Sequence, residues 1–268
     1  QHFSSDKWYQ EMDDLDDFSY YPGYVSLMEA QADYVEEKWT QGFDTYDRQD
    51  YISQIPNIQC RVTLPSYFYI PAELYYGYGP LLAKEIIKNG KMEGLNTALY
   101  GYVNNGLNTL PTSEQIYEPD KFFIDERYEE FSIDSIEVNG FTLIDEGNFG
   151  ALDLVYLMQD NIGQKNAVKA AVGIGGGAWK DYVNDSGELL MTVKLSGDNS
   201  TELQELYDAF ILWAQEQSRF SVGEPLVGGN LFLGDTIFWI SVDEGFIRIV
   251  LSQNIDLLNS ISNQIKNF

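Results

Sequence analysis

Apolar side chains recur at helical spacing near the start of the chain. Between residues 24 and 39 they stand three or four positions apart, which predicts a helix with one apolar face. The residues of this face are Val25, Met28, Ala32, Val35 and Trp39. Glu29 falls at the edge of the face, so we expect its carboxylate to be partly buried and to need a cation or several hydrogen-bond donors.

The rest of the first half is predicted to be mostly helical, with one irregular stretch. Residues 44–71 contain three prolines and are expected to form a loop with a short strand near 60–64. Gly90 is expected to separate two longer helices, because glycine is a frequent helix stop. The helices expected after the loop cover 72–89, 91–103 and a short segment from Thr112 or Ser113 to Pro119.

After about residue 126 the chain changes to short apolar runs separated by turn residues, which are typical of strands and hairpins. Strands are expected near 132–145, 178–183, 189–195, 236–242 and 246–252, and helices near 148–160, 165–172, 200–219 and 255–265. This mixed order predicts an α+β fold. We therefore divide the chain into a mostly helical part, residues 1–125, and an α+β module, residues 126–268.

The balance of charge limits the classes of partner. The chain has 42 acidic against 16 basic residues, a formal net charge of −26. Such a surface repels the phosphates of nucleic acids and of anionic lipids, so neither is expected as a partner. No apolar run is long enough to cross a bilayer, so no membrane-spanning segment is predicted. Aromatic residues make up 15% of the chain and leave material for an interface, so we expect a protein partner or self-assembly.

Few residues suit nucleophilic or nucleotide chemistry. The single histidine, His2, lies in an acidic N-terminal arm, so a Ser-His-Asp or Cys-His device is not expected. Cys60, the single cysteine, is expected to be a buried apolar residue. The glycine run 173–177 follows a helix and precedes a strand, the reverse of a dinucleotide loop, so it predicts a tight corner that uses positive φ. Paired carboxylates of the glycosidase type stay open, because no pair stands out by spacing.

Two acidic groups leave calcium binding open. The first is the cluster Asp13–Asp17, whose spacing does not match an EF-hand loop and which is otherwise a solvated arm. The second is the stretch Asp181–Glu188. A calcium-dependent surface module is therefore a third hypothesis beside the two that follow from the resemblance described next.

Four segments carry a family pattern. They are Gln1–Phe3, Leu27–Ala32 with its central glutamate, Pro111–Phe122 and Ala170–Gly177. In this order and spacing the chain resembles exported HExxH (gluzincin-like) zinc metallopeptidase-like proteins of bacteria and archaea. In those proteins the segments follow the zinc-binding helix, carry the third zinc ligand, form a Pro-x-Ser-Thr-Glu-Gln-x-x-His-Pro-x-Lys-Tyr segment, and open a second module.

The resemblance implies that Glu29 would be the third zinc ligand, beside two histidines of an HExxH helix whose glutamate acts as general base. No HExxH occurs in this chain, and by the alignment it would lie upstream of Gln1. The Gly-Asp pair that follows the ligand in the family is Ala30-Gln31 here, and the histidine before proline is replaced around Glu118. Glu29 alone cannot hold a catalytic zinc ion.

Two functional hypotheses follow. The leading one is an exported pseudoenzyme, extracellular or at the cell surface, which works without a cofactor as a binding or structural assembly subunit. The alternative is a zinc endopeptidase whose HExxH segment lies upstream of Gln1 and is cleaved from the chain or omitted from it.

Overall fold

The computed structural model describes residues 21–54, 68–105, 109–129, 132–243, 245–261 and 263–264. The chain divides into two compact units, Gln1–Ile124 and Asp125–Phe268, next to the division expected between residues 125 and 126. The positions of the two units relative to one another are not determined, so each is described by itself.

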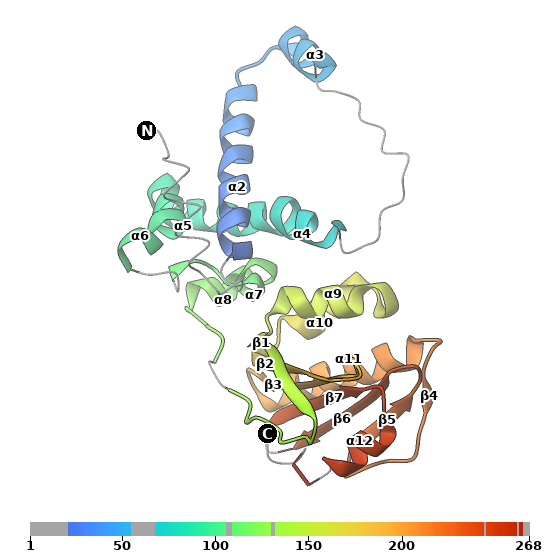
Figure 1. Cartoon of the computed structure of the whole chain (residues 1–268). Coiled ribbons are helices and arrows are strands. Elements are labelled where there is room, and N and C mark those ends of the chain that lie inside the picture. The colour runs from blue at the N-terminus through green and yellow to red at the C-terminus, as the bar shows by residue number, and fades with distance from the viewer. Residues whose placement is uncertain are drawn as a thin grey trace. The chain divides into compact units, whose positions relative to one another are not determined.

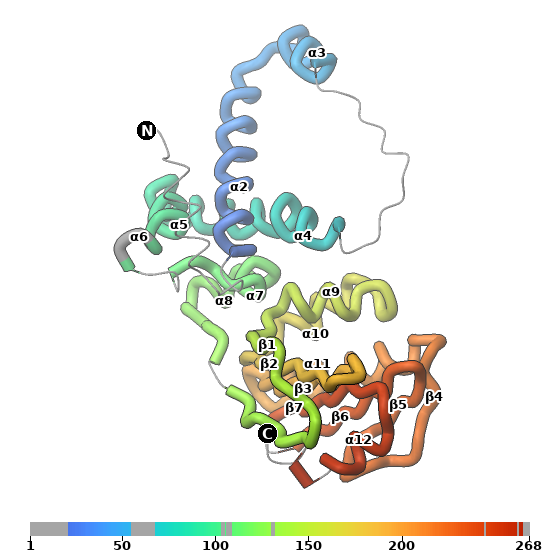
Figure 2. The backbone as a smooth tube through the Cα atoms, in the orientation of Figure 1, coloured from blue at the N-terminus to red at the C-terminus, as the bar shows by residue number. Residues whose placement is uncertain are grey.

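The first unit is helical throughout its described residues (Figures 1 and 2). Its helices are α2 (Tyr21–Thr40), α3 (Thr45–Gln54), α4 (Ile70–Glu73), the π-helix η2 (Leu74–Tyr78), α5 (Gly79–Tyr100), α6 (Tyr102–Asn105), α7 (Ser113–Tyr117) and α8 (Pro119–Phe123). The expected break at Gly90 is confirmed, because Lys91 has a φ of 56° and a ψ of −161° inside α5.

The core of the first unit forms where the beginning of α2 packs on α5, η2 and α7. Leu27 is fully buried there, and small residues allow the close approach. A Cβ atom at Gly23 would lie 1.8 Å from the carbonyl oxygen of Pro111, and one at Gly79 would lie 2.8 Å from that of Ser26. The buried part of α2 therefore combines small residues, such as Gly23, Ser26 and Ala30, with the larger side chains of Tyr24, Val25 and Leu27.

This packing corrects the expected orientation of α2. Of the predicted apolar face only Val25 is buried, whereas Met28, Val35 and Trp39 are 37%, 58% and 59% exposed. The physical reason is that Gly23 of α2 and Gly79 of α5 let Pro111 and α5 come closer to this side of α2 than they could to the bulkier apolar side. The periodicity predicted the helix correctly and its buried side wrongly.

The second unit contains a seven-stranded antiparallel sheet with helices, which confirms the α+β class. Its elements are β1 (Phe141–Asn148), α9 (Ala151–Ile162), α10 (Gln164–Ala171), β2 (Ile174–Asn184), β3 (Leu189–Gly197), α11 (Ser200–Glu216), β4 (Ser221–Val222), β5 (Asn230–Leu233), β6 (Ile237–Asp243), β7 (Phe246–Ser252) and α12 (Ile255–Ser260). The strand order is β1-β2-β3-β7-β6-β5-β4. Figure 1 shows the sheet together with these helices.

Apolar side chains cover both faces of this sheet. On one face α11 packs on β2, β3 and β7, and the ring of Trp213 lies edge-on to that of Phe238, with centroids 5.3 Å apart. On the other face Trp239, Tyr182 and Leu258 belong to a second buried cluster. The indole Nε1 of Trp239 donates a hydrogen bond of 2.7 Å to the carbonyl oxygen of Leu226, so this buried donor is satisfied.

Some segments differ from their sequence-based expectations, and one cannot be compared with its expectation. Helix α3 replaces the first part of the expected loop 44–71, and its N-terminus is capped by the Asp44 carboxylate, which accepts from the backbone N–H groups of Tyr46 and Asp47. The expected short strand at 60–64 lies outside the described residues. Strands β4 and β5 were not expected, whereas the one or two strands expected within 132–145 correspond to β1.

The glycine run also differs from its expectation. Gly175, Gly176 and Gly177 lie inside β2, and none of them has a positive φ. Their role is close packing instead: a Cβ atom at Gly177 would come within 2.6 Å of both Phe149 and Leu195. The small residues bring neighbouring segments onto the strand, and the corner itself occupies the two residues before Ile174.

Among the described residues, no helix is both long enough and apolar enough to cross a bilayer.

Candidate functional site

Glu29, the predicted zinc ligand, lies on α2 and is half-buried. The phenol of Tyr76, on the π-helix η2, lies near enough to its carboxylate for the two groups to interact electrostatically. The pKa of Tyr76 is raised, first by the partial removal of the phenol from water and then by the nearby carboxylate of Glu29, with a smaller contribution from Asp33. Short π-helices are frequent at functional sites, so this contact marks the surface for attention.

Gln31, two positions after Glu29, connects α2 to α5. The side-chain amide of Gln31 donates to Asn96 Oδ1 at 2.9 Å, and its oxygen accepts from the Tyr100 hydroxyl at 3.4 Å. Burial raises the pKa of Tyr100. The chemistry around Glu29 is thus carboxylate, amide and phenol, which provides hydrogen bonding but only one strong metal ligand on the α2 side.

The other residues that could complete a metal site do not join Glu29. His2, Cys60 and the cluster Asp13–Asp17 lie outside the described residues. Within the described residues no group of three possible ligands contains Glu29. The structure therefore neither adds a ligand to Glu29 nor tests the histidine pair that the resemblance places upstream.

The second acidic stretch considered for calcium is divided between different roles. Asp181 lies in β2 opposite Asp145 of β1, and its pKa is raised by burial first and by the Asp145 charge second. Glu188 instead accepts a hydrogen bond of 2.5 Å from the Asn184 side chain in the following turn. Among the described residues neither carboxylate belongs to a group of three possible ligands.

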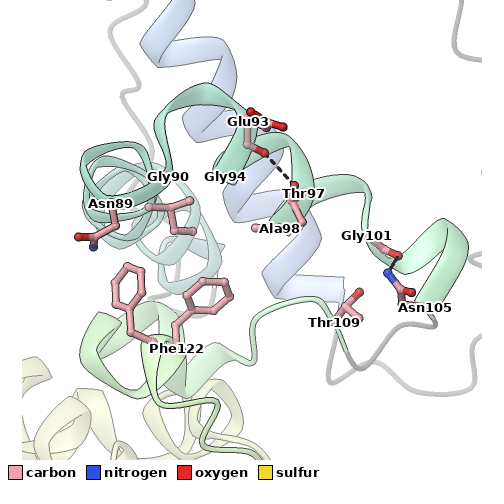
Figure 3. Close-up of a pocket in the computed structure, with 12 residues that line it drawn as sticks. Asn89, Gly90, Glu93, Gly94, Thr97, Ala98, Gly101, Asn105, Thr109 and Phe122 are labelled. Atoms are coloured by element: carbon pink, nitrogen blue, oxygen red, sulfur yellow. Dashed lines mark hydrogen bonds between the residues drawn. The ribbon is translucent and has the colours of Figure 1, made fainter.

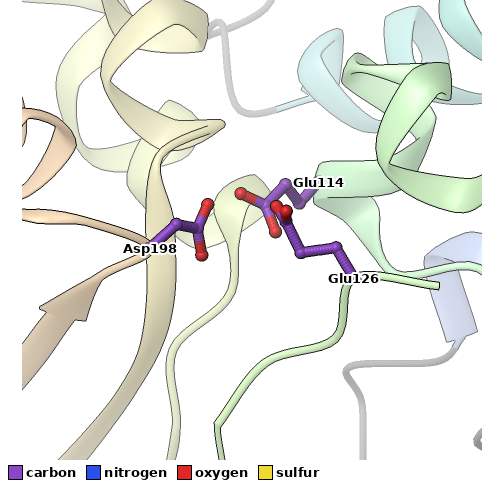
Figure 4. A group of neighbouring side chains, drawn as sticks. All are labelled: Glu114, Glu126 and Asp198. Atoms are coloured by element: carbon purple, nitrogen blue, oxygen red, sulfur yellow. The ribbon is translucent and has the colours of Figure 1, made fainter. Parts of the chain in front are cut away.

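Figure 4 draws three further carboxylates, Glu114, Glu126 and Asp198. Glu114 belongs to the first unit and the other two belong to the second, so we treat them separately. Within the second unit, carboxylate oxygens of Glu126 and Asp198 lie within 4.8 Å of each other. Two carboxylates are fewer ligands than zinc or calcium takes from a dedicated protein site, so this pair does not define a metal site.

The segment that resembles the third family motif is a buried polar turn. Of the two candidates for the N-terminus, Thr112 and Ser113, Thr112 is the cap of α7, and it forms a capping box with Gln115. Glu114 is 1% exposed, and its Oε1 lies 3.1 Å from the Nζ atom of Lys121, whose side chain is 9% exposed. The polar residues of this motif therefore stabilise the helix pair α7–α8 and are not presented to a ligand.

An open groove of ≈ 540 Å³ lies along the second half of α5 (Figure 3). Its walls are small residues of α5, such as Gly94 and Ala98, and the rings of Phe122 and Phe123, which meet edge to face with centroids 5.5 Å apart. Glu93 is the only charged residue of the lining. The groove is shaped for an apolar side chain and carries no paired acid and base.

An exposed apolar feature of the first unit lies on α2. We call the residues Met28, Ala32, Val35 and Trp39 the α2 stripe; all four are exposed. At its end, the rings of Trp39, Phe43 and Tyr51 meet edge to face, and the Tyr51 hydroxyl donates a hydrogen bond of 2.5 Å to Glu36. These contacts hold α3 against the end of α2 while the stripe stays open.

No family model, curated protein or solved structure matches this chain. The resemblance to HExxH proteins therefore stays a prediction. The assignment of Glu29 as a metal ligand likewise stays a prediction, and sequence reasoning missed the groove on α5 and the exposure of the α2 stripe. The sequence signal for the stripe is the four-three-four spacing of its apolar residues. This spacing occurs both in helix faces that are buried in a core and in faces that pair with another helix.

Proposed function

We propose that this chain is an exported, metallopeptidase-derived protein that in this form works by binding a protein partner, not by proteolysis. The observation that carries the proposal is the α2 stripe, which is exposed although it has the spacing of a helix-pairing seam. The buried side of α2, with Gly23 and Leu27, is already used against α5 and α7. Binding of a partner would remove the stripe from water.

The spacing of the α2 stripe defines the kind of partner. Residues 28, 32, 35 and 39 occupy alternating d and a positions of a heptad, and they span about 16 Å of helix. Glu29 and Glu36 take the flanking e positions. The complementary surface is a helix with an apolar seam flanked by lysine or arginine.

A second copy of this chain fits the α2 stripe poorly. In an antiparallel pair of α2 helices, e positions face each other, so Glu29 of one copy would meet Glu36 of the other. The net charge of −26 adds general repulsion between copies. We therefore assign the stripe to a basic helical segment of a different protein.

The test uses a synthetic peptide of three heptads with leucine or isoleucine at a and d and lysine at e and g. Binding to the full chain is measured by fluorescence anisotropy of the labelled peptide. We expect Val35→Asp to weaken binding about tenfold or more, because it puts a charge in the apolar seam. The matched control is Ile52→Asp, an exposed apolar residue of α3 outside the stripe, which should bind like the original chain.

A scrambled peptide of equal composition separates seam recognition from general attraction to an acidic protein. Equal binding of the two peptides, or equal loss in Val35→Asp and Ile52→Asp, would refute the proposal. A circular dichroism spectrum of each variant checks that α2 is intact, which is expected because both residues are exposed.

The zinc endopeptidase is the second candidate, favoured by the half-buried Glu29 beside Tyr76. Its test is a zinc titration of the full chain together with Glu29→Gln and Glu36→Gln. Glu36→Gln is a close control, since Glu36 also lies on α2 and its carboxylate accepts a hydrogen bond from the Tyr51 hydroxyl. Zinc affinity that falls only in Glu29→Gln would support the peptidase-type ligand; equal affinity in all three proteins would refute it.

A further inference from the structure

Two basic residues face each other in the middle of the acidic chain's sheet. Lys194 of β3 and Arg248 of β7 are direct cross-strand partners, and these strands are the third and fourth of the seven. Direct partners in an antiparallel sheet have Cβ atoms about 5 Å apart on the same face. Like charges at this distance destabilise a sheet unless an anion lies between or beside them.

Both cationic groups gather at the same aromatic ring. The Nζ atom of Lys194 lies 4.6 Å from the ring centroid of Phe246, and the guanidinium carbon of Arg248 lies 5.9 Å from it. Arg248 is buried, and Asp243 forms an ion pair with it. Lys194 is half-buried and forms no ion pair of 4 Å or less within the described residues, so its charge is the one still uncompensated at close range.

The surroundings make this uncompensated charge costly. Burial lowers the pKa of Lys194, and the charge of Arg248 lowers it further, while Asp134 acts in the opposite direction. In water an ammonium group has neither penalty. The free energy cost would be removed by a negative group that contacts Lys194.

A neighbouring hydroxyl adds a second unmatched polar group. Thr192 lies two residues before Lys194 in β3, so the two side chains are on the same face, about 7 Å apart along the strand. Thr192 is fully buried, and its Oγ1 has no hydrogen-bond partner in the part of the chain that the structure describes. Lys180, which faces Thr192 from β2, is already committed to Glu146 and Ser135.

We propose that Lys194 and Arg248 form a binding site for a compact oxyanion, a carboxylate or a phosphate group, on this face of the sheet. The ammonium group of Lys194 contacts the anion directly. Arg248, which forms an ion pair with Asp243, adds positive electrostatic potential. Thr192 offers a hydroxyl donor on the same face of the sheet. We expect the anion to be compact, because Arg248 is already paired with Asp243 and only the half-buried side chain of Lys194 is left to contact the anion.

The test measures the thermal unfolding of the full chain in sodium acetate and in inorganic phosphate, each against sodium chloride at the same ionic strength. We expect one of the two anions to raise the melting temperature by several degrees with saturable dependence on concentration. Lys194→Met keeps the alkyl chain over Phe246 and should abolish the rise. Lys169→Met is the control, because Lys169 is exposed and paired with Glu205 on α10 and α11.

A second variant separates binding from folding. Lys194→Arg keeps the charge and should retain the anion-dependent rise, whereas Lys194→Met without added anion should melt at the same or a higher temperature than the original chain. Acetate-specific stabilisation would identify a carboxylate ligand, and phosphate-specific stabilisation a phosphate. A rise that persists in Lys194→Met, or no saturable rise with either anion, would overturn the site.

Discussion

The buried ion pair of Glu114 and Lys121 predicts a large and unequal response to the loss of one charge. Both side chains are almost completely buried, and Nζ and Oε1 are 3.1 Å apart. Lys121→Met leaves the Glu114 carboxylate in a poorly solvated place without its cation. Breaking a buried pair in this way costs about 3–5 kcal/mol of folding free energy, because the remaining charge keeps its desolvation penalty.

Removing both charges should cost less than removing one. In the double variant Glu114→Gln, Lys121→Met no isolated charge is left in the buried turn, so we expect it to be more stable than Lys121→Met. The coupling free energy from the double-mutant cycle should be about 1–3 kcal/mol. The result would show that the polar residues Glu114 and Lys121 act through their pairing inside α7 and α8.

The assay must report on the first unit alone, since two units can unfold in separate steps. Hydrogen exchange followed by mass spectrometry gives this resolution through peptides that cover α5 and α7. The control is Lys88→Met: Lys88 forms a 2.8 Å ion pair with Glu85, but the two side chains are 71% and 45% exposed. Water screens that pair, so its loss should leave protection unchanged. Equal loss of protection in Lys88→Met and Lys121→Met would refute the reasoning from burial.

Two further predictions concern backbone packing and the sheet edge. Gly23→Ala should destabilise the first unit by more than about 1 kcal/mol, because the new Cβ atom meets the Pro111 carbonyl, whereas Gly90→Ala, with nothing within 4 Å, should be neutral or stabilising in hydrogen exchange. Asp145→Asn should stabilise the second unit at pH 7, since the pKa of Asp181 is raised by burial and by Asp145. A carboxyl group with a raised pKa favours the folded state below its ordinary pKa of about 3.9 and loses that contribution as the pH rises through the raised value. The gain from Asp145→Asn in urea unfolding should therefore disappear below about pH 4, and a gain independent of pH would contradict this cause.

Local chemistry made much of the fold readable. The capping box at Thr112, the stop at Gly90 and the hairpin turn before Phe246 are each set by residues within four positions of one another. Such signals do not depend on the rest of the chain, so sequence spacing was sufficient to place helices and strands. Helix α3 is an exception: its capping residue Asp44 is such a local signal, but the prolines that follow the helix outweighed it and the segment was expected to be a loop.

The packing of the elements could not be predicted from the sequence, because two arrangements satisfy the same pattern of apolar residues. Helix α2 has an apolar side with Val35 and a small-residue side with Gly23, and the periodicity favours burial of the first. The structure buries the small-residue side, since Pro111 approaches α2 closely at Gly23, and α5 approaches it closely at Gly79. The register that sets Lys194 opposite Arg248 is likewise a property of strand pairing, which no spacing within β3 or β7 specifies.

The two proposed sites should respond to salt in opposite ways. At the α2 stripe a basic partner approaches a protein with a net charge of −26, so association is fast at low ionic strength and slows as salt screens the attraction. At Lys194 an anion must approach against the same net charge, and only the last contact is attractive. Consider a salt whose ions do not compete for the site. It screens the long-range repulsion, which acts beyond a Debye length of about 8–10 Å, more strongly than it screens the direct contact between the anion and the ammonium group. Raising the ionic strength should therefore weaken heptad-peptide binding while it leaves oxyanion binding unchanged or stronger. If both interactions weakened in parallel, the anion would be held by distributed surface charge and not by the pair Lys194 and Arg248.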